Sequence, residues 1–154
     1  MVQLKEGMNA PGFEGIDQKG NEVKLSNFIG KKIVLYFYPK DNTPGCTAEA
    51  CNLRDNYDSL IKKGFAVIGI SPDNEKSHKG FTMKYSLPFP LIADTSKKIL
   101  SDYGVWGEKK MYGKIYMGVI RTTFIIDEKG IIENIITKVD TADHTEQIFK
   151  IYNK

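Results

Sequence analysis

Cysteine, histidine and tryptophan are scarce in this chain of 154 residues, which has two, two and one of them respectively. The two cysteines and the two distant histidines, His78 and His144, lack the spacing of a zinc site. An excess of one charge is missing too, because the formal net charge is only +3 and the basic residues are scattered. Composition therefore gives no argument for nucleic-acid binding.

Long apolar runs are also missing. Residues 1–7 contain no apolar signal core, and no run approaches the length of a membrane span. We therefore expect a cytoplasmic protein, in a compartment where disulfides are usually transient and catalytic rather than structural. With 41% hydrophobic and 27% charged residues and no linker or repeat, the chain predicts one compact domain over residues 1–154.

The most informative stretch reads as a strand, a turn and a helix with a thiol at the bend. Residues 33–38 are apolar, β-branched and aromatic, as in a buried strand, and Pro39 ends it because proline cannot donate to a sheet ladder. Thr43 before Pro44 predicts a helix start, in which the hydroxyl accepts a backbone N–H and proline sacrifices no hydrogen bond. Cys46 then falls in the first turn, where the helix dipole favours the thiolate and nucleophilic chemistry.

The rest of the chain alternates strands with helices, which indicates an α/β domain with a mixed sheet and an N-terminal hairpin. Strands are predicted at residues 13–16, 22–25, 65–70, 91–93, 121–126 and 131–138. Helices are predicted from residue 44 to a stop at Gly64 and at residues 74–85, 96–103 and 145–152, with a capped turn at 26–30. The glycine- and lysine-rich residues 105–119 are predicted to form a loop.

Each candidate residue also has an ordinary structural interpretation. Both cysteines could be small buried apolar side chains, although a place in a first helical turn argues against this for Cys46. Arg121 could be a solvated residue at the rim, or a fixed positive charge for a thiolate and an anionic transition state. Glu49 is expected to face solvent or to support the helix start, and His78 and His144 are expected at the surface.

The stretch around Cys46 resembles peroxiredoxins. Residues 39–46, Pro-Lys-Asp-Asn-Thr-Pro-Gly-Cys, are similar to the Pro-x-x-x-Thr-x-x-Cys motif of that family. Residues 46–51, Cys-Thr-Ala-Glu-Ala-Cys, resemble the two-cysteine helix of its bacterioferritin comigratory protein, or Q-type, branch. The similarity continues through residues 103–110 and 116–124 to the end of the chain. It implies a thioredoxin-like three-layer fold with a central mixed β-sheet and an N-terminal β-hairpin extension.

The resemblance also implies roles for individual residues. Cys46 would be the peroxidatic cysteine and Cys51 the resolving cysteine, with Thr43 and Arg121 positioning peroxide and thiolate. The implied substrate-binding residues are Pro39, Thr43, Gly45 and Arg121, with Pro39 shielding the pocket.

The implied reaction is the reduction of hydrogen peroxide and organic hydroperoxides, which the sequence does not rank. Cys46 would become a sulfenic acid, Cys51 would condense with it to a disulfide, and a thioredoxin-type protein would reduce that disulfide. No cofactor, metal or haem is expected, because the O–O bond is weak and needs only alignment and charge stabilisation. The internal resolving thiol favours a monomer, and neither nucleic acid nor a membrane is expected as a partner.

The spacing of the two cysteines predicts a conformational change. On an intact helix, Cα atoms five residues apart are separated by about 7.5 Å of rise and roughly 140° of rotation, or about 8 to 9 Å overall. A disulfide tolerates at most about 7 Å. We therefore expect residues from 43 to about 53 to unwind on oxidation.

Two other functions stay open at this stage. A thiol–disulfide oxidoreductase is disfavoured, because the cysteines lack Cys-x-x-Cys spacing and the strand that would carry a proline beside the site begins with Arg121 and Thr122. The alternative from another class is a noncatalytic chaperone or binding module whose cysteines sense oxidation.

Overall fold

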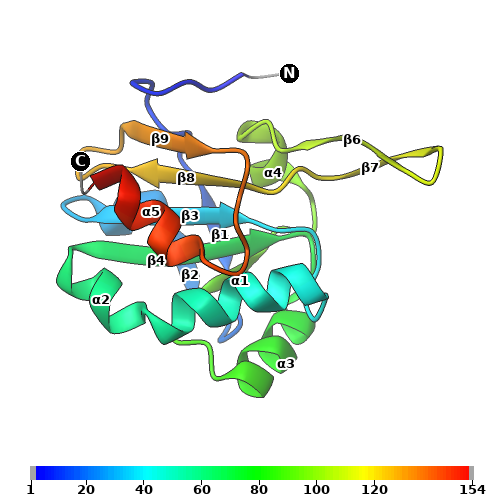
Figure 1. The fold of residues 1–154 in the computed structure, drawn as a ribbon, viewed down its shortest axis with the longest axis horizontal. Helices are drawn as coiled ribbons and strands as arrows, with labels where there is room; N and C mark the ends of the chain where they lie inside the picture. Colours follow the sequence, from blue (N-terminus) through cyan, green and yellow to red (C-terminus); the bar gives the residue numbers. More distant parts are fainter. Residues whose placement is uncertain (1–2, 153–154) are drawn as a thin grey trace.

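A five-stranded mixed sheet lies at the centre of the computed structural model, which describes residues 3–152 (Figure 1). The strand order is β5-β4-β3-β8-β9. The first three of these strands are mutually parallel, whereas β8 runs antiparallel to both β3 and β9. The strands are β3 (Lys32–Phe37), β4 (Phe65–Ser71), β5 (Leu91–Ala93), β8 (Thr122–Ile126) and β9 (Ile132–Ile136). The predicted mixed sheet is confirmed.

Strand β3 contributes to two separate apolar cores. Leu35 and Phe37 pack into the core on one face of the sheet, and Tyr36 and Tyr38 pack into the core on the other. Both faces of the strand are therefore buried. This explains why its sequence is a continuous apolar run instead of an alternation of apolar and polar residues.

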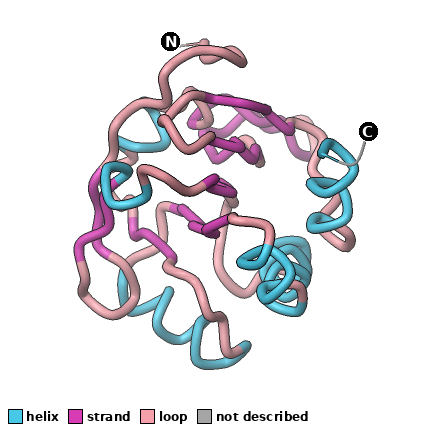
Figure 2. Tube along the Cα trace, turned by 90° about the vertical axis from the view of Figure 1, so that its left-hand side faces the viewer, coloured by secondary structure: helices cyan, strands magenta, loops and turns pink. Residues whose placement is uncertain are grey.

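Helices lie on both sides of the strands (Figure 2). The core that contains Tyr36 also contains Leu53 of α1, Leu60 of α2, Phe81 of α3 and Ile148 of α5, so these four helices pack on one face. The helices are α1 (Pro44–Asp55), α2 (Tyr57–Lys62), α3 (Glu75–Tyr85), α4 (Lys98–Asp102) and α5 (His144–Tyr152). None of the helices within residues 3–152 has the length and apolar character needed to cross a membrane.

The opposite face is covered by the N-terminal part of the chain and α4. The predicted N-terminal hairpin is confirmed as β1 (Glu14–Ile16) and β2 (Glu22–Lys24), followed by the short 3₁₀ helix η1 (Leu25–Phe28). Phe13 and Ile99 join the core on this side. The three-layer arrangement with an N-terminal hairpin extension is therefore confirmed.

The predicted long helix from Pro44 to Gly64 is wrong in one respect, because Asn56 divides it into α1 and α2. Asn56 has φ −110° and ψ 15°, which is not helical. Its side-chain Nδ2 donates a hydrogen bond of 2.8 Å to the carbonyl oxygen of Asn52, which also accepts from the backbone N–H of Asn56. A short polar side chain that competes for the helix's own acceptor favours such an interruption. Gly64, with φ +87°, does end the second helix.

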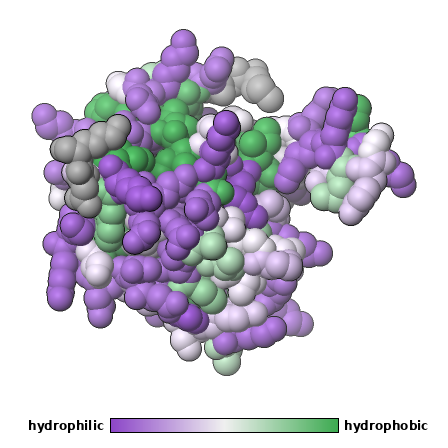
Figure 3. Space-filling model, in the orientation of Figure 1, coloured by the Kyte–Doolittle hydropathy of each residue, from purple (hydrophilic) through white to green (hydrophobic). Residues whose placement is uncertain are grey.

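The predicted loop at residues 105–119 is also wrong. This segment forms an antiparallel hairpin of β6 (Trp106–Met111) and β7 (Lys114–Val119), which projects from the body of the protein (Figure 1). Tyr112 and Gly113 make its turn with φ +53° and +76°, the pair of positive values that a two-residue hairpin turn requires. Polar and apolar side chains are mixed on its surface (Figure 3), so no apolar alternation marked the strands.

Candidate active site

The register of the sheet brings Cys46 and Arg121 together. Phe37 at the end of β3 is paired with Thr122 at the start of β8, because these strands run antiparallel. The loop that follows β3 and the residue that precedes β8 therefore meet at one end of the sheet. Cys46 is the third residue of α1, which follows that loop, and Arg121 directly precedes β8.

One guanidinium group contacts both the thiol and a carboxyl group. Arg121 Nη2 donates to Cys46 Sγ at 3.2 Å, and Nη1 donates to Glu49 Oε1 at 2.7 Å. The thiol is buried, with 1% of Cys46 exposed. Burial acts to lower the pKa of Arg121, but attraction to Glu49 and Cys46 outweighs it, so the pKa lies above its usual value. Of the two interpretations of Arg121, the structure agrees with the charge beside the sulfur and not with a solvated residue at the rim.

Gly45 allows this close approach. A Cβ atom at this position would lie 3.3 Å from Arg121 Nη2, tighter than an ordinary van der Waals contact. Glycine therefore leaves room for the guanidinium to reach the sulfur of the next residue.

The expectation that Glu49 faces solvent is wrong. Its side chain is completely buried against Arg121, with which it forms an ion pair. Burial raises the pKa of Glu49 to about 7, although the charge and hydrogen bond of Arg121 act to lower it. One signal for this position was present in the sequence, because Glu49 follows Cys46 by three residues and so lies on the same face of the helix.

The expectation that His144 lies at the surface is also wrong. It is the first residue of α5 and is completely buried, with Nε2 at 2.8 Å from Thr123 Oγ1 and at 3.6 Å from Glu49 Oε2. Burial lowers the pKa of His144 to about 4; its hydrogen bond to Gln147 acts to raise it and the charge of Arg121 acts to lower it. No local sequence pattern marked this residue, since it reaches the site from the far end of the chain.

His78 is the third wrongly predicted surface residue. It is completely buried on α3, with Nδ1 at 2.7 Å from Asp41 Oδ2 and Nε2 at 3.0 Å from the carbonyl oxygen of Ile92. Asp41 Oδ1 accepts from the Tyr38 hydroxyl at 2.7 Å, and its backbone N–H donates to Asp73 at 2.8 Å. This buried network fixes the loop between β3 and α1 against α3 and the end of β4.

Thr43 occupies the predicted cap position but does not make the predicted cap. Its hydroxyl donates to the carbonyl oxygen of Lys40 at 2.8 Å, and its side chain accepts no hydrogen bond from the first turn of α1. Thr43 therefore closes the preceding loop. Pro39 follows β3 as predicted and is partly exposed.

Cys51 lies in the same helix as Cys46. It is partly exposed, and both thiols are free. Because α1 runs without interruption from Pro44 to Asp55, the two cysteines are held at the separation of an intact helix. The next residue, Asn52, fixes this part of α1 to α5, since its side chain donates to the carbonyl oxygen of Ala142 at 2.9 Å and accepts from the N–H of Thr145 at 2.8 Å.

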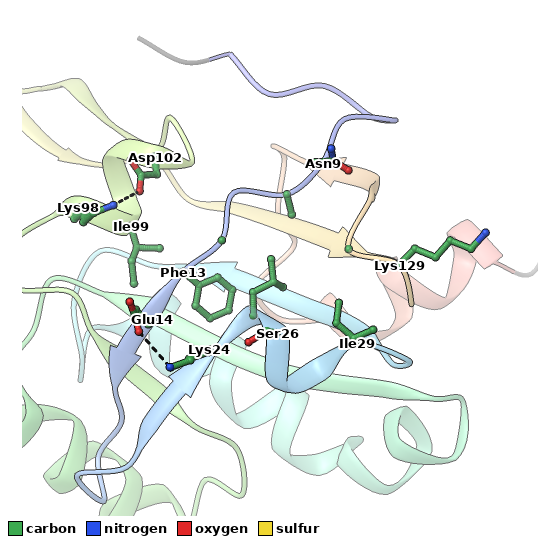
Figure 4. A pocket seen from close by; sticks show the side chains of 14 residues that line it. Asn9, Phe13, Glu14, Lys24, Ser26, Ile29, Lys98, Ile99, Asp102 and Lys129 are labelled. Carbon is green, nitrogen blue, oxygen red and sulfur yellow. Dashed lines mark hydrogen bonds and ion pairs between the residues drawn. The ribbon is translucent and has the colours of Figure 1, made fainter.

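A separate cavity of about 600 Å³ lies on the opposite face of the sheet (Figure 4). Phe13 and Ile99 form part of its floor, and ion pairs of Glu14 with Lys24 and of Lys98 with Asp102 lie at its sides. It contains none of the site residues predicted from the sequence. The site residues predicted from the sequence therefore lie around Cys46 and not in this cavity.

Comparison with known proteins gives one consistent answer. Residues 7–135 match the model of the AhpC/TSA family. Peroxiredoxin Bcp of Bacillus subtilis is 45% identical over 146 residues, covering 95% of this chain and 93% of the relative. The fold is similar to a cysteine-to-serine mutant of PrxQ from Xylella fastidiosa, with 27% identity, a TM-score of 0.91 and 100% of each chain covered.

A third similar protein is described for its chemistry. This is the bacterioferritin comigratory protein of Xanthomonas campestris, whose structures were determined to study its alkyl peroxide reduction activity. Its sequence is 32% identical and its TM-score is 0.84, with 90% of this chain and 88% of that chain covered.

The thioredoxin-like fold and the buried thiol beside an arginine at a helix start define a thiol-dependent peroxidase. Such an enzyme uses a peroxide substrate and a reductant. The chain belongs to the AhpC/TSA family, in the peroxiredoxin Bcp branch. The family and fold that the sequence predicted are confirmed.

Proposed function

We propose that Cys46 is the peroxidatic cysteine of this peroxidase. The observation that carries the proposal is the 3.2 Å contact between Arg121 Nη2 and Cys46 Sγ in the first turn of α1. The guanidinium charge and the helix N-terminus both favour the thiolate. The thiolate attacks one oxygen of a hydroperoxide and the O–O bond breaks. The departing oxygen takes up a proton, which yields water or an alcohol and leaves a sulfenic acid on Cys46.

The substrates that fit this site are hydrogen peroxide and organic hydroperoxides. The activity of the Xanthomonas campestris relative toward alkyl peroxides supports the organic class. Arg121 stabilises the developing negative charge on the departing oxygen. The Thr43 hydroxyl donates its hydrogen bond to the carbonyl oxygen of Lys40. Its oxygen can therefore accept a hydrogen bond from the O–H of a hydroperoxide. Gly45 supplies the room for Arg121, and Pro39 shields the pocket.

Cys51 is proposed as the resolving cysteine. Its thiol attacks the sulfenic acid of Cys46, so that an intramolecular disulfide forms and water leaves. The separation of the two cysteines on the intact helix α1 requires the first turns to unwind before the bond can close. A thioredoxin-type dithiol then reduces the disulfide. Resolution within one chain needs no thiol from a second subunit, which favours a monomer. A disulfide that is reduced again in every cycle is typical of cytoplasmic proteins, which favours that location.

Peroxide consumption driven by dithiothreitol tests these roles. Cys46→Ser should abolish consumption, whereas Cys51→Ser should keep the first oxidation of Cys46 and lose the intramolecular disulfide. Mass spectrometry of the oxidised wild type should show loss of two hydrogens and a peptide cross-linked between residues 46 and 51. Insulin reduction is the comparison assay. Consumption by Cys46→Ser, or insulin reduction that is faster than peroxide consumption, would contradict the assignment.

A further inference from the structure

Four buried or partly buried side chains form a continuous chain from the reactive sulfur into the protein. Arg121 contacts Cys46 through one nitrogen and Glu49 through another. Glu49 in turn faces His144, whose Nε2 atom lies 3.6 Å from Oε2. Oε2 is the second oxygen of the carboxyl group and, unlike Oε1, has no hydrogen-bond partner. Burying a carboxyl oxygen that accepts no hydrogen bond is energetically unfavourable. Protonation of Oε2 would remove its negative charge and so reduce this cost.

The hydrogen bonds of His144 determine which of its nitrogens is an acceptor and which is a donor. Gln147 Oε1 accepts from the N–H of Asp140 at 3.0 Å, and its Nε2 donates to Lys138 at 2.7 Å, so the orientation of this amide is fixed. His144 Nδ1 lies 2.9 Å from the same Oε1 and must therefore donate to it. In neutral His144, Nε2 is consequently an acceptor; it accepts from the Thr123 hydroxyl at 2.8 Å and also faces Glu49 Oε2 at 3.6 Å.

Charge balance favours one extra proton in this chain of groups. When Cys46 is a thiolate and Glu49 a carboxylate, two anions share the single cation Arg121. An unpaired charge in a buried cluster is strongly unfavourable. Burial raises the pKa of Glu49 to about 7 and lowers that of His144 to about 4, so the proton resides on Glu49 rather than on the imidazole.

We propose that Glu49 and His144 form a positioning pair in which Glu49 carries one proton on Oε2, facing Nε2 of neutral His144, and that this proton determines how much of the Arg121 charge is available to Cys46 and its peroxide. A protonated Glu49 still accepts from Arg121 through Oε1 but leaves the guanidinium charge to the sulfur. An ionised Glu49 neutralises that charge. The proposal rests on the role of Cys46 given above and adds His144 to the residues that control it.

The other groups around Glu49 and His144 are compatible with the gain and loss of a proton by Glu49. The charged and titratable side chains that face Glu49 are Cys46 on its own helix, Arg121 before β8, Tyr36 on β3 and His144 on α5, while Asp140 acts on His144. Burial raises the pKa of Tyr36 well above its usual value, so it stays neutral. Glu49 is therefore the carboxyl group of this cluster that gains or loses a proton near pH 7.

The first test is the pH dependence of Cys46 oxidation by hydrogen peroxide, followed as loss of the thiol in a single turnover. In the wild type, the rate constant should fall above pH 7, by up to about tenfold for each pH unit if only the protonated form reacts. Glu49→Gln, a permanently neutral isostere, should remove this decrease. Glu146→Gln changes an exposed carboxylate close to His144 in sequence and should keep it. A decrease in Glu49→Gln as steep as in the wild type would overturn the proposal.

The second test does not use activity. The pKa of Glu49 is read from the carbon-13 NMR signal of its carboxyl group during a pH titration. His144→Asn keeps a donor for Gln147 but removes Nε2, and should lower the pKa of Glu49; His144→Gln, whose amide reaches further, should restore part of it. An unchanged pKa in His144→Asn would overturn the proposal. If the wild type reacts with peroxide at no pH, the proposed function fails, and this titration still decides on the pair.

Discussion

Arg121 Nη2 lies 3.2 Å from Cys46 Sγ, while Nη1 of the same guanidinium lies 2.7 Å from Glu49 Oε1. The two contacts use adjacent nitrogens of one planar group, so the carboxyl group fixes the orientation in which the arginine meets the sulfur. The cation beside the Cys46 sulfur is therefore held from its buried side.

Arg121→Ala should lower the rate constant for peroxide reduction by about 100- to 1000-fold, the usual effect of removing one donor to a developing charge. The fold should persist, because Arg121 lies outside the two apolar cores. The rate is measured with hydrogen peroxide and the fold by circular dichroism. Arg54→Ala, which removes the other arginine of the chain, is the matched control and should keep the wild-type rate. A fully active, folded Arg121→Ala would exclude the residue from the mechanism.

Gly45→Ala should slow Cys46 oxidation by about tenfold, because the added Cβ meets Arg121 Nη2 at 3.3 Å and displaces the guanidinium from the sulfur. Gly80→Ala is the control. Gly80 lies in α3 with no atom within 4 Å of an added Cβ, so this substitution should leave the rate unchanged and stabilise the helix by about 0.5 to 1 kcal/mol. Equal rates for both variants would show that the contact with Gly45 does not position Arg121.

Oxidation of the two cysteines should remove the amide protection of residues 47–53, because the disulfide cannot close on an intact α1. Hydrogen exchange of the reduced and disulfide forms measures this change. The amide of Thr145, which donates to Asn52 Oδ1, should stay protected in both forms. Peroxide-treated Cys51→Ser serves as the control, since it cannot form the bond. Equal protection of residues 47–53 in both wild-type forms would mean that Cys51 is not the resolving thiol.

The free energy of unfolding of Glu49→Gln, relative to the wild type, should rise with pH. The pKa of Glu49 is about 7 in the folded protein against 4.5 for an ordinary carboxyl group. The folded state thus binds the proton more tightly, and wild-type stability is lost as the pH rises from 4.5 through 7. Glu49→Gln has no carboxyl group to titrate. Its free energy of unfolding relative to the wild type should therefore rise by about 3 kcal/mol between pH 4.5 and pH 7.

The titration of His144 changes the free energy of unfolding in the opposite direction. The variant must therefore be compared with the wild type at each pH. Its pKa is about 4 in the folded protein against 6.5 ordinarily, so its contribution to stability is present above pH 6.5 and is lost as the pH falls through 4. The two contributions largely cancel in the wild type between pH 4.5 and 6.5. Urea unfolding at several pH values checks the prediction, and curves for wild type and Glu49→Gln that stay parallel would contradict it.

The sequence predicted the sheet and the position of Cys46 at the start of a helix, because both depend on local patterns. A continuous apolar run ended by Pro39, and a helix start at Thr43 and Pro44, placed Cys46 correctly. The hairpin of β6 and β7 was missed because its strands are largely exposed, so burial imposed no alternation on them.

The buried polar groups could not be predicted in the same way. His144 reaches Glu49 from α5, and His78 reaches Asp41 from α3, so each pair joins distant parts of the chain. A glutamate is typical of the surface, and a histidine is found both buried and exposed, so the residue types alone did not indicate burial. Only the packing of the helices on the sheet shows that these side chains are removed from water and paired.

The segment with both cysteines is held by hydrogen bonds at its two ends. Asp41 is held by the hydrogen bonds of His78 and Tyr38, and Asn52 is held by the first turn of α5. The chain between Asp41 and Asn52 has a fixed number of residues. Any extra length that unwinding of α1 provides therefore stays between these two residues. In the proposed redox cycle, the same short length of chain therefore unwinds and rewinds in each turnover while the sheet behind it keeps its shape.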